Sequence, residues 1–424
     1  MTLVRPFQAL RYDTDRVDLS NVVVPPYDVI ADDERAAFFD RDPHNAIRLE
    51  LTKNVEDQAT TDYSEIRATL DAWQRDRVLC RDAEAGFYAL RQRFTAPDGS
   101  VSVREGFFAL LHLEDYAKGI VRPHERTLAG PKADRLKVMR ATRANLSSVF
   151  LLYEDRDNEL AKAIAPNFDG EALASGTDAS GATHTLAKIA DRERVEAVER
   201  FLRERQVVIA DGHHRYETSL AYRDEQRAAG AGDTGAHEWL LAYFANAWAP
   251  GCLLLPIHRL ILKAAPLAQG ALSARLPGWT ESTVAVPNEE AVPALLEKHL
   301  EPLSDRPAFA ADDASGVLRI FSREPDATGE LSVRIIHREV IDGVFGLDER
   351  AVRDGAIEYP KSALRTARDV RSGRGSVALY LNALSPDDVF RVAGAGEVLP
   401  QKSTFFFPKL PTGLVFRTFE DGAA

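Results

Sequence analysis

The residues with the clearest chemical pattern are the five at 211–215, Asp-Gly-His-His-Arg. They follow the apolar run 207–210, which is typical of a buried strand, and precede a segment expected to be helical as far as residue 227. Gly212 permits a tight turn, and the first amide groups of a helix have no partners within the helix and carry partial positive charge. Because Arg215 falls within one turn of that end, the segment predicts a site for a small anion, most simply a phosphate.

Two other interpretations of these residues were weighed. Asp-Gly is a common turn, and Asp211 can simply cap the helix behind it. Adjacent histidines diverge by about 100° on a helix, so one metal ion rarely binds both, and the sequence has no His-x-x-x-His or Cys-x-x-Cys pattern. A structural zinc site is therefore not expected. A Mg²⁺ ion held by Asp211 and phosphate oxygens is compatible, since Mg²⁺ usually takes only one or two carboxylates.

A second group of chemically capable residues lies at 122–135. Pro123 precedes His124 and Glu125, and Arg135 closes the group. A rigid proline before a His-Glu pair indicates a positioned loop, in which either side chain could take the proton of a hydroxyl group. A cluster of ion pairs on a solvated surface is the alternative.

The segment 400–409 is the third candidate. Lys402 and Ser403 invite comparison with a P-loop, but Gln401 stands where that motif has glycine, so the motif fails. A strand that seals a core, with Lys402 and Lys409 extending their ammonium groups to solvent, is the simpler interpretation. A phosphate-binding role for Lys402 and Ser403 is the other prediction.

The pattern of apolar residues predicts a mixed α/β protein that positions these groups. With 424 residues, the chain is too long for one ordinary core. We expect three lobes, at 1–155, 156–262 and 263–424, of which the central one contains the 211–215 turn. Hairpins are predicted at 87–113 and at 239–262.

Composition limits the partners. The 65 acidic residues outnumber the 53 basic ones, for a net charge of −12, which argues against a broad nucleic-acid groove and favours a small anionic ligand. No run of about 18 apolar residues predicts a membrane span. Two cysteines make a disulfide framework unexpected, and the cytoplasm is the expected compartment.

Taken in order, the motifs resemble the domain-of-unknown-function 1015 family of bacteria and archaea, from about Arg5 to Phe419. The segments that carry the resemblance are Arg5-Pro6-Phe7, Pro25-Pro26-Tyr27-Asp28-Val29, His124-Glu125, Asp134-Arg135-Leu136, Ala210 to Thr218, Pro400 to Thr404 and Phe407-Pro408-Lys409. The turn at 211–215 is also similar to the phosphate-binding turn of the ParB/sulfiredoxin-like superfamily. That group includes free-serine kinases, CTP-binding ParB proteins and sulfiredoxins.

The resemblance implies a ParB/sulfiredoxin-like core with additional α+β lobes. It also implies a phosphotransferase that acts on the hydroxyl of a small metabolite, L-serine in the first instance, with pyrophosphate or a nucleotide as donor and Mg²⁺ as cofactor. A CTP-binding switch of the ParB type and a non-catalytic sensor of phosphorylated metabolites are the alternatives. Sulfiredoxin chemistry needs a reactive cysteine beside the turn, where this chain has histidine.

Carried over residue by residue, the resemblance implies that Gly212, His213, His214 and Arg215 hold the donor phosphates and that Asp211 lies near Mg²⁺. Glu125 is the first candidate for the general base, ahead of Asp28 and Glu50. The remaining predictions are His124, Asp211 and His214 as catalytic groups, and Tyr27, Asp28 and Arg135 as substrate-binding groups.

Overall fold

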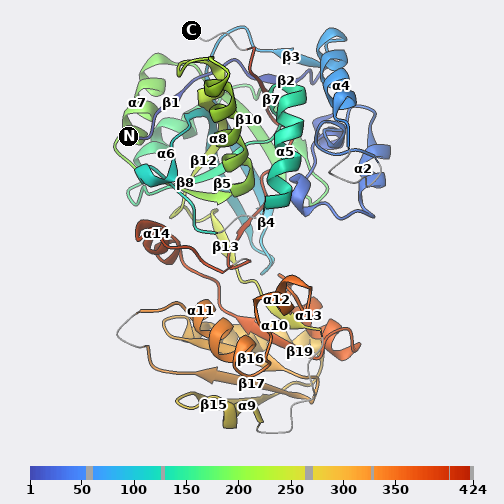
Figure 1. Ribbon diagram of the computed structural model, residues 1–424, viewed down its shortest axis with the longest axis vertical. Coiled ribbons are helices and arrows are strands. Elements are labelled where there is room, and N and C mark those ends of the chain that lie inside the picture. The colour runs from blue at the N-terminus through green and yellow to red at the C-terminus, as the bar shows by residue number, and fades with distance from the viewer. Residues whose placement is uncertain (54–60, 126–128, 263–270, 326–328, 401, 421–424) are drawn as a thin grey trace. The chain divides into compact units, whose positions relative to one another are not determined.

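The computed structural model describes residues 1–53, 61–125, 129–262, 271–325, 329–400 and 402–420. Backbone packing divides the chain into two compact units, whose elements are labelled in Figure 1. The first unit contains Met1–Leu253, Ala393–Val398 and Pro408–Ala424, and the second contains Leu254–Val392 and Leu399–Phe407. This division differs from the three lobes expected at 1–155, 156–262 and 263–424, because strands of the first two share one sheet and the end of the third returns to the first unit.

A mixed sheet forms the centre of the first unit. Its strands are β1 (Val4–Arg5), β4 (Phe87–Thr95), β5 (Val101–His112), β6 (Val121–Arg122), β8 (Val149–Tyr153), β9 (Ala174–Thr177), β10 (Thr183–Ile189), β11 (Val207–Asp211) and β12 (Trp239–Asn246). Among the described residues the order is β6-β11-β8-β12-β5-β4-β10-β9, with β1 paired to β5. β4 and β5 form an antiparallel hairpin, which confirms the prediction for 87–113.

The hairpin predicted at 239–262 is wrong. β12 pairs antiparallel with β5 on one side and parallel with β8 on the other. Every residue of β12 after Trp239 is buried. Because both edges of β12 already have hydrogen-bonded neighbours, the chain that follows it cannot return alongside it.

Helices α5 and α8 pack against each other in the first unit and carry most of the charged residues considered below (Figure 1). The helices of this unit are α1 (Leu19–Val22), α2 (Arg35–Arg41), α3 (Ile47–Glu50), α4 (Ser64–Arg75), α5 (Ala129–Thr142), α6 (Glu159–Ile164), α7 (Arg192–Arg203) and α8 (His213–Ala228), with short 3₁₀ turns at Tyr27–Val29, Tyr116–Lys118, Ala165–Phe168 and Ala236–Glu238. The amphipathic α7 buries Val198 and Leu202, as its apolar spacing predicts.

The first unit also contains two short strand pairs, β2 (Leu10–Tyr12) with β3 (Leu79–Arg81) and β7 (Ala144–Asn145) with β21 (Arg417–Thr418). The second pair ties the C-terminal segment to this unit. Single bridges join Val24 to Thr412 and Leu10 to Phe416. The residues after Pro408 therefore run through the first unit and bring Lys409 to its sheet.

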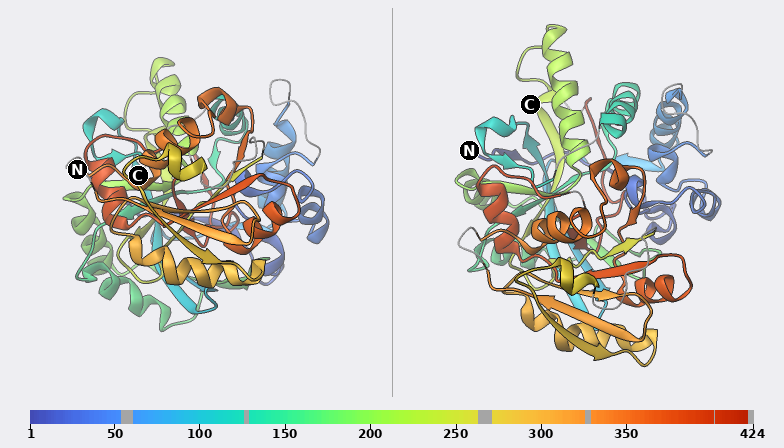
Figure 2. Two further views of the ribbon diagram at one scale, coloured as in Figure 1. Left: turned by 90° about the horizontal axis from the view of Figure 1, so that it is seen from below. Right: turned by 60° about the horizontal axis from the view of Figure 1, so that its bottom comes forward.

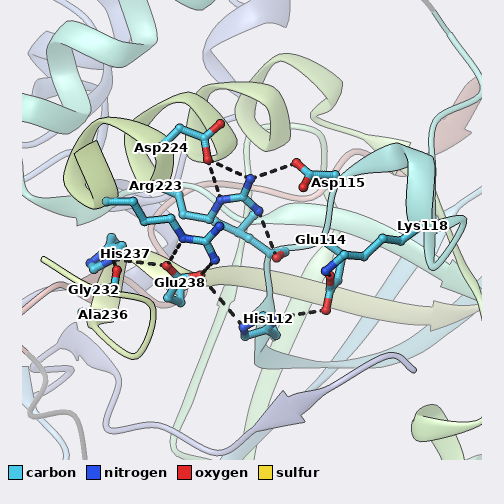
Figure 3. A network of polar contacts seen from close by, with 12 residues as sticks. His112, Glu114, Asp115, Lys118, Arg223, Asp224, Gly232, Ala236, His237 and Glu238 are labelled. Carbon is cyan, nitrogen blue, oxygen red and sulfur yellow. Dashed lines mark hydrogen bonds and ion pairs between the residues drawn. The ribbon is translucent and has the colours of Figure 1, made fainter. Parts of the chain in front are cut away.

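The far end of α8 is held by a polar network, drawn in Figure 3. Arg227 donates to both oxygens of Glu238, at 2.7 and 2.6 Å, and Arg223 reaches Asp115 at 2.8 Å. Glu238 is fully buried. Both arginines thus join α8 to the segments that flank β5 and β12.

The second unit is built on a separate sheet in the order β15-β17-β16-β19-β14-β18. Its strands are β13 (Leu253–Leu255), β14 (Arg259–Ile261), β15 (Thr280–Ala285), β16 (Ala308–Asp312), β17 (Val317–Ser322), β18 (Ile357–Glu358), β19 (Val377–Leu381) and β20 (Phe405–Phe407), of which β13 and β20 form a pair of their own. Its helices are α9 (Ala271–Arg275), α10 (Val292–His299), α11 (Ser332–Ile336), α12 (Glu349–Arg353), α13 (Ala363–Arg371) and α14 (Pro386–Gly394), with 3₁₀ turns at Glu289–Ala291 and Glu301–Leu303 and a π-helical segment at His337–Asp342.

Apolar clusters cover both faces of this second sheet, one around Phe309 and Phe321 and one around Ala310 and Ile320. The backbone of its strands and helices is drawn in two further views in Figure 2. Successive residues of a strand point to opposite faces, so alternate residues of β16 and β17 enter different clusters. The protein as a whole is of the mixed α/β class that the sequence predicts. Within the described chain, no helix combines the length and the apolarity needed to cross a membrane.

Candidate functional site

The predicted strand, turn and helix around residue 212 are confirmed. β11 ends at Asp211, where the pairing with β8 shifts register after Ile209, and α8 begins at His213. Gly212 has φ +89°, the left-handed region that favours glycine. A Cβ atom at this position would also lie 2.9 Å from Nε of Arg215. Glycine is thus required both by the backbone and by the side chain folded over it.

Asp211 lies between two cations. Its Oδ2 accepts from Nη2 of Arg215 at 3.1 Å, and its Oδ1 accepts from Nζ of Lys409 at 3.1 Å. Burial on its own would raise the pKa of Asp211, but Lys409 and Arg215 together outweigh burial and hold that pKa well below the usual range. The carboxylate is therefore ionised at neutral pH, and the three groups together carry one net positive charge.

This arrangement does not fit Asp211 as a metal ligand, because each of its oxygens already contacts a cation. The predicted binding of Mg²⁺ at Asp211 stays a prediction. The sequence predicted that Lys409 extends its ammonium group to solvent, whereas the structure pairs it with Asp211. The sequence feature that could have indicated a role at the site is the place of Lys409 in the Phe-Pro-Lys motif.

Arg215 is fixed by its other contacts. Its Nη1 donates to the carbonyl oxygen of Ser148, which follows α5 and precedes β8. Burial would lower the pKa of Arg215, yet the carboxylates of Asp211 and Asp28 more than offset it, so the pKa is raised. The guanidinium is a permanent cation with a defined position at the start of α8.

Two buried imidazoles stand beside the turn. The backbone N–H of His124 donates to Nε2 of His213 at 3.4 Å, and the rings meet edge to face with centroids 4.8 Å apart. Burial lowers the pKa of both histidines. The ring of His124 lowers the pKa of His213 further, while Asp211 opposes the shift at His213 and Glu125 opposes it at His124. His213 is therefore neutral, and because its Nε2 accepts, its Nδ1 carries the proton.

Glu125, the predicted base, directly follows His124 and is half-buried. Its charge partly opposes the lowering of the pKa of His124. The carboxylate of Glu125 is therefore close enough to His124 to act on its charge.

Other predicted residues also lie near Arg215. His214 is half-buried, and burial lowers its pKa while Asp28 and Glu217 oppose the shift. The guanidinium of Arg135 stacks on the ring of Tyr27 at 4.3 Å. Burial, followed by the charge of Asp28, raises the pKa of Tyr27 to about 12.

Arg135 is itself held by two carboxylates. Its Nη1 donates to Oε2 of Glu50 at 3.1 Å and to the carbonyl oxygen of Glu50 at 2.9 Å, and its Nη2 donates to Oδ2 of Asp134 at 2.7 Å. Tyr63 donates its hydroxyl to the other oxygen of Asp134. Glu50 is only 2% exposed, and burial raises its pKa despite the opposing charge of Arg135.

Lys402 and Ser403 belong to the second unit, whereas the turn belongs to the first. Ser403 donates its hydroxyl to the carbonyl oxygen of Pro400 at 2.6 Å, and the carbonyl oxygen of Lys402 accepts from Arg259 at 3.3 Å. These contacts order the segment locally. Phosphate binding by Lys402 and Ser403 stays a prediction.

Arginine, lysine, neutral imidazole and carboxylate groups are thus assembled around one helix N-terminus. The predicted residues that the first unit brings together there are Tyr27, Asp28, His124, Glu125, Arg135, Asp211, Gly212, His213, His214 and Arg215. Such a group can bind an anion and can accept a proton from a bound hydroxyl.

Comparison with known proteins gives the following matches. No curated protein matches the chain. Among solved structures, a free serine kinase in complex with AMP is 14% identical with a TM-score of 0.35, and the match covers 70% of this chain and 86% of that one. A conserved hypothetical protein from Pyrococcus furiosus is 13% identical with a TM-score of 0.35, covering 74% and 96%. C-terminally truncated SbnI from Staphylococcus aureus is 10% identical with a TM-score of 0.33, covering 73% and 86%.

At TM-scores below 0.5 these matches do not bear on function. The match to a sequence family is of a different kind, since it spans most of the chain. The family described as "Protein of unknown function (DUF1015)" matches residues 4–314, which include the turn, the His124 segment and the Arg135 segment. The chain belongs to this family.

Proposed function

We propose that the protein is a phosphotransferase that moves a phosphoryl group from a donor at the 211–215 turn to the hydroxyl of a small metabolite. The observation that carries the proposal is the start of α8, where Gly212 precedes the first helical residue and Arg215 and Lys409 both contact Asp211. A helix N-terminus with adjacent fixed cations stabilises the negative charge of phosphate oxygens and of the transition state between them.

The surrounding groups have separate roles in this proposal. Arg215 and Lys409 neutralise charge on the donor, and the protonated Nδ1 of neutral His213 can donate to a phosphate oxygen. The acceptor oxygen forms a bond to phosphorus as the bond from phosphorus to the bridging oxygen of the donor breaks, and the remainder of the donor leaves with that oxygen. Glu125 takes the proton of the acceptor hydroxyl.

The finer form of the proposal names L-serine as acceptor and pyrophosphate or a nucleotide as donor. Its support is the resemblance of the turn to that of free-serine kinases, together with the acidic overall charge. Mg²⁺, when bound to the donor, would neutralise part of its phosphate charge. Asp211 is not assigned as its ligand, since Arg215 and Lys409 occupy both oxygens.

The direct test incubates the purified protein with L-serine, Mg²⁺ and one donor at a time: pyrophosphate, ADP, ATP or CTP. Formation of O-phosphoserine, measured by mass spectrometry, is expected with at least one donor. Lys409→Met should reduce kcat/KM by about 10-fold to 100-fold, the effect of one lost charged contact. Arg140→Gln is the matched control, because Arg140 is an exposed cation of α5 paired with Glu225. The absence of turnover with every donor would overturn the proposal.

A non-catalytic sensor of phosphorylated metabolites would not need the general base Glu125, whereas a phosphotransferase would. Glu125→Gln should abolish turnover while the donor still raises the melting temperature, if the protein is a phosphotransferase with this base. A non-catalytic sensor would show the same donor-induced shift in both proteins and no turnover in either.

A further inference from the structure

A small cavity, partly open to solvent, has Arg215 in its wall. Its volume is about 40 Å³. Its polar wall is formed by Glu50, Arg135, Ser147, Arg215, Thr218 and Ser219. Arg215 is therefore shared between this cavity and the 211–215 turn, which places the cavity beside the proposed donor site.

The two cations of the wall are already satisfied by the protein. Arg135 donates to Glu50 and Asp134, and Arg215 donates to Ser148 and Asp211. A bound anion would therefore have to compete with existing partners on both guanidinium groups.

The unsatisfied groups of the wall are oxygen atoms. Among the described residues, Oε1 of Glu50 and Oγ1 of Thr218 are buried and have no partner at hydrogen-bonding distance. Glu50 is 2% exposed and Thr218 is 1% exposed. A buried carboxylate oxygen without a donor is energetically unfavourable, so it is a position where a donor group is expected.

The missing partner must be small and rich in donors. A cavity needs about 10–15 Å³ to hold one water molecule, so this one has room for a few non-hydrogen atoms and not for a whole metabolite. A primary ammonium group carries three donors and one positive charge, which matches a bare carboxylate oxygen beside a hydroxyl. Burial raises the pKa of Glu50, while the charges of Arg135 and Arg215 and a hydrogen bond from Ser147 oppose the shift.

We infer that this cavity receives the ammonium end of the acceptor, with Glu50 as its counter-ion and Thr218 as a second acceptor of its protons. The inference rests on the proposed function. It names the substrate class as a small hydroxyl compound with a primary amine, such as a hydroxy amino acid or an amino alcohol. The hydroxyl end of that compound then lies on the turn side of Arg215, and Glu50 is a specificity-determining residue and not the base.

The chain offers matched variants to test this. Glu50→Gln removes the charge from the cavity and keeps the size of the side chain, and Thr218→Val removes the hydroxyl and keeps the shape. Asp134→Asn is the control, because Asp134 is the other carboxylate on Arg135 but is not part of the cavity wall. Melting temperatures of all four proteins check that each variant is folded.

The acceptors to compare are L-serine, ethanolamine, which lacks the carboxylate, and 3-hydroxypropionate, which lacks the amine. Steady-state kinetics with the best donor and calorimetric titration of each compound are the readouts. For both amines, Glu50→Gln should raise KM and the dissociation constant by about 10-fold to 100-fold, while kcat changes by no more than a few-fold. Thr218→Val should raise the same two constants by about 2-fold to 10-fold. Asp134→Asn should change neither constant by more than about 2-fold. For 3-hydroxypropionate, Glu50→Gln should have no such effect.

The outcomes separate the two proposals. If L-serine is phosphorylated but Glu50→Gln leaves KM and the dissociation constant unchanged, or lowers kcat alone, the cavity holds water only and the inference is overturned. If no acceptor is phosphorylated but both amines bind in a manner that requires Glu50, the phosphotransferase is overturned and the ammonium site stands.

Discussion

At the scale of single residues, the turn is a charge-balanced unit in which each group restrains the next. Lys409 and Arg215 share one carboxylate, and the guanidinium lies over Gly212, where any side chain would displace it. The neutral His213 adds a proton donor without adding charge. Positive charge at the start of α8 therefore depends on side chains whose positions are set by contacts, not by sequence adjacency alone.

Gly212→Ala is expected to cost more than the same change at Gly230. Both glycines have φ +89°. Each substitution therefore forces an alanine into the left-handed backbone conformation, which destabilises the folded protein by about 1–2 kcal/mol. At Gly230 nothing lies within 4 Å of the added Cβ, whereas at Gly212 the Cβ meets Arg215 at 2.9 Å. Urea unfolding should show the larger loss for Gly212→Ala, and only that variant should lose the donor-induced rise in melting temperature. Equal losses in both variants would contradict a role for the Gly212–Arg215 contact.

His213 predicts a pH dependence of stability. Burial lowers its pKa in the folded protein, so below about pH 6.5 the unfolded chain binds a proton that the folded chain does not. Stability from this residue is therefore complete above that pH and is lost as the pH falls toward the lower, folded pKa. The slope of unfolding free energy against pH, measured between about pH 6.5 and 5, should become shallower by up to one proton in His213→Asn. An unchanged slope would show that His213 is not buried in neutral form.

At the scale of elements, α8 is held at two ends for different purposes. Its first turn carries the proposed site, while its last two turns are tied by Arg223 and Arg227 to the segments around β5 and β12 (Figure 3). Helix α5 lies against it and contributes Arg135. The site therefore depends on two packed helices whose relative position is set away from the chemistry.

Arg227→Met should destabilise the protein and leave the site intact. The change removes the guanidinium from the fully buried Glu238, whose remaining contacts include the imidazoles of His237 at 3.2 Å and His112 at 4.0 Å. The expected loss is about 1–3 kcal/mol, less than for a fully buried pair because Arg227 is 39% exposed. Arg192→Met is the control, since Arg192 forms an exposed pair with Glu196 within α7. Urea unfolding measures the loss, and the donor-induced shift in melting temperature should persist in both variants.

At the scale of the whole molecule, the chain leaves the first unit after Leu253 and comes back to it at the end. Its final segment supplies Lys409 to Asp211 and β21 to β7. Within that segment Arg417 is fully buried, donates to the carbonyl oxygens of Trp239 and Ala236, and has its pKa lowered by burial to about 9. The last residues are thus part of the core of the first unit.

A chain that ends at Phe407 should lose the first unit and keep the second. It lacks β21 and Arg417, so the carbonyl groups around Trp239 lose their donors, while both segments of the second unit remain complete. Hydrogen exchange followed by mass spectrometry is expected to show lost protection in β5 and β12 and retained protection in β16 and β19. Retained protection in β5 and β12 would contradict a core role for the final segment.

The sequence by itself determined the local parts of this protein. The strand at 207–211, the glycine turn and the helix from His213 follow from residues that are neighbours in the chain, as does the β4–β5 hairpin. The helix closes its hydrogen bonds within a few residues and the hairpin joins consecutive strands, while β11 is indicated by its own apolar run, so propensity and spacing carry the information.

Tertiary structure decided the rest. Lys409 meets Asp211 across 198 positions, Glu50 meets Arg135 across 85, and β12 found partners in β5 and β8 where a hairpin was predicted. Local patterning shows that such residues are charged or apolar, but not which distant partner satisfies them. Which partner is available depends on the order of the strands in the sheet and on how α5 packs on α8. Because a buried polar group has no water to bind, it must form its hydrogen bonds with the protein groups that the fold places beside it.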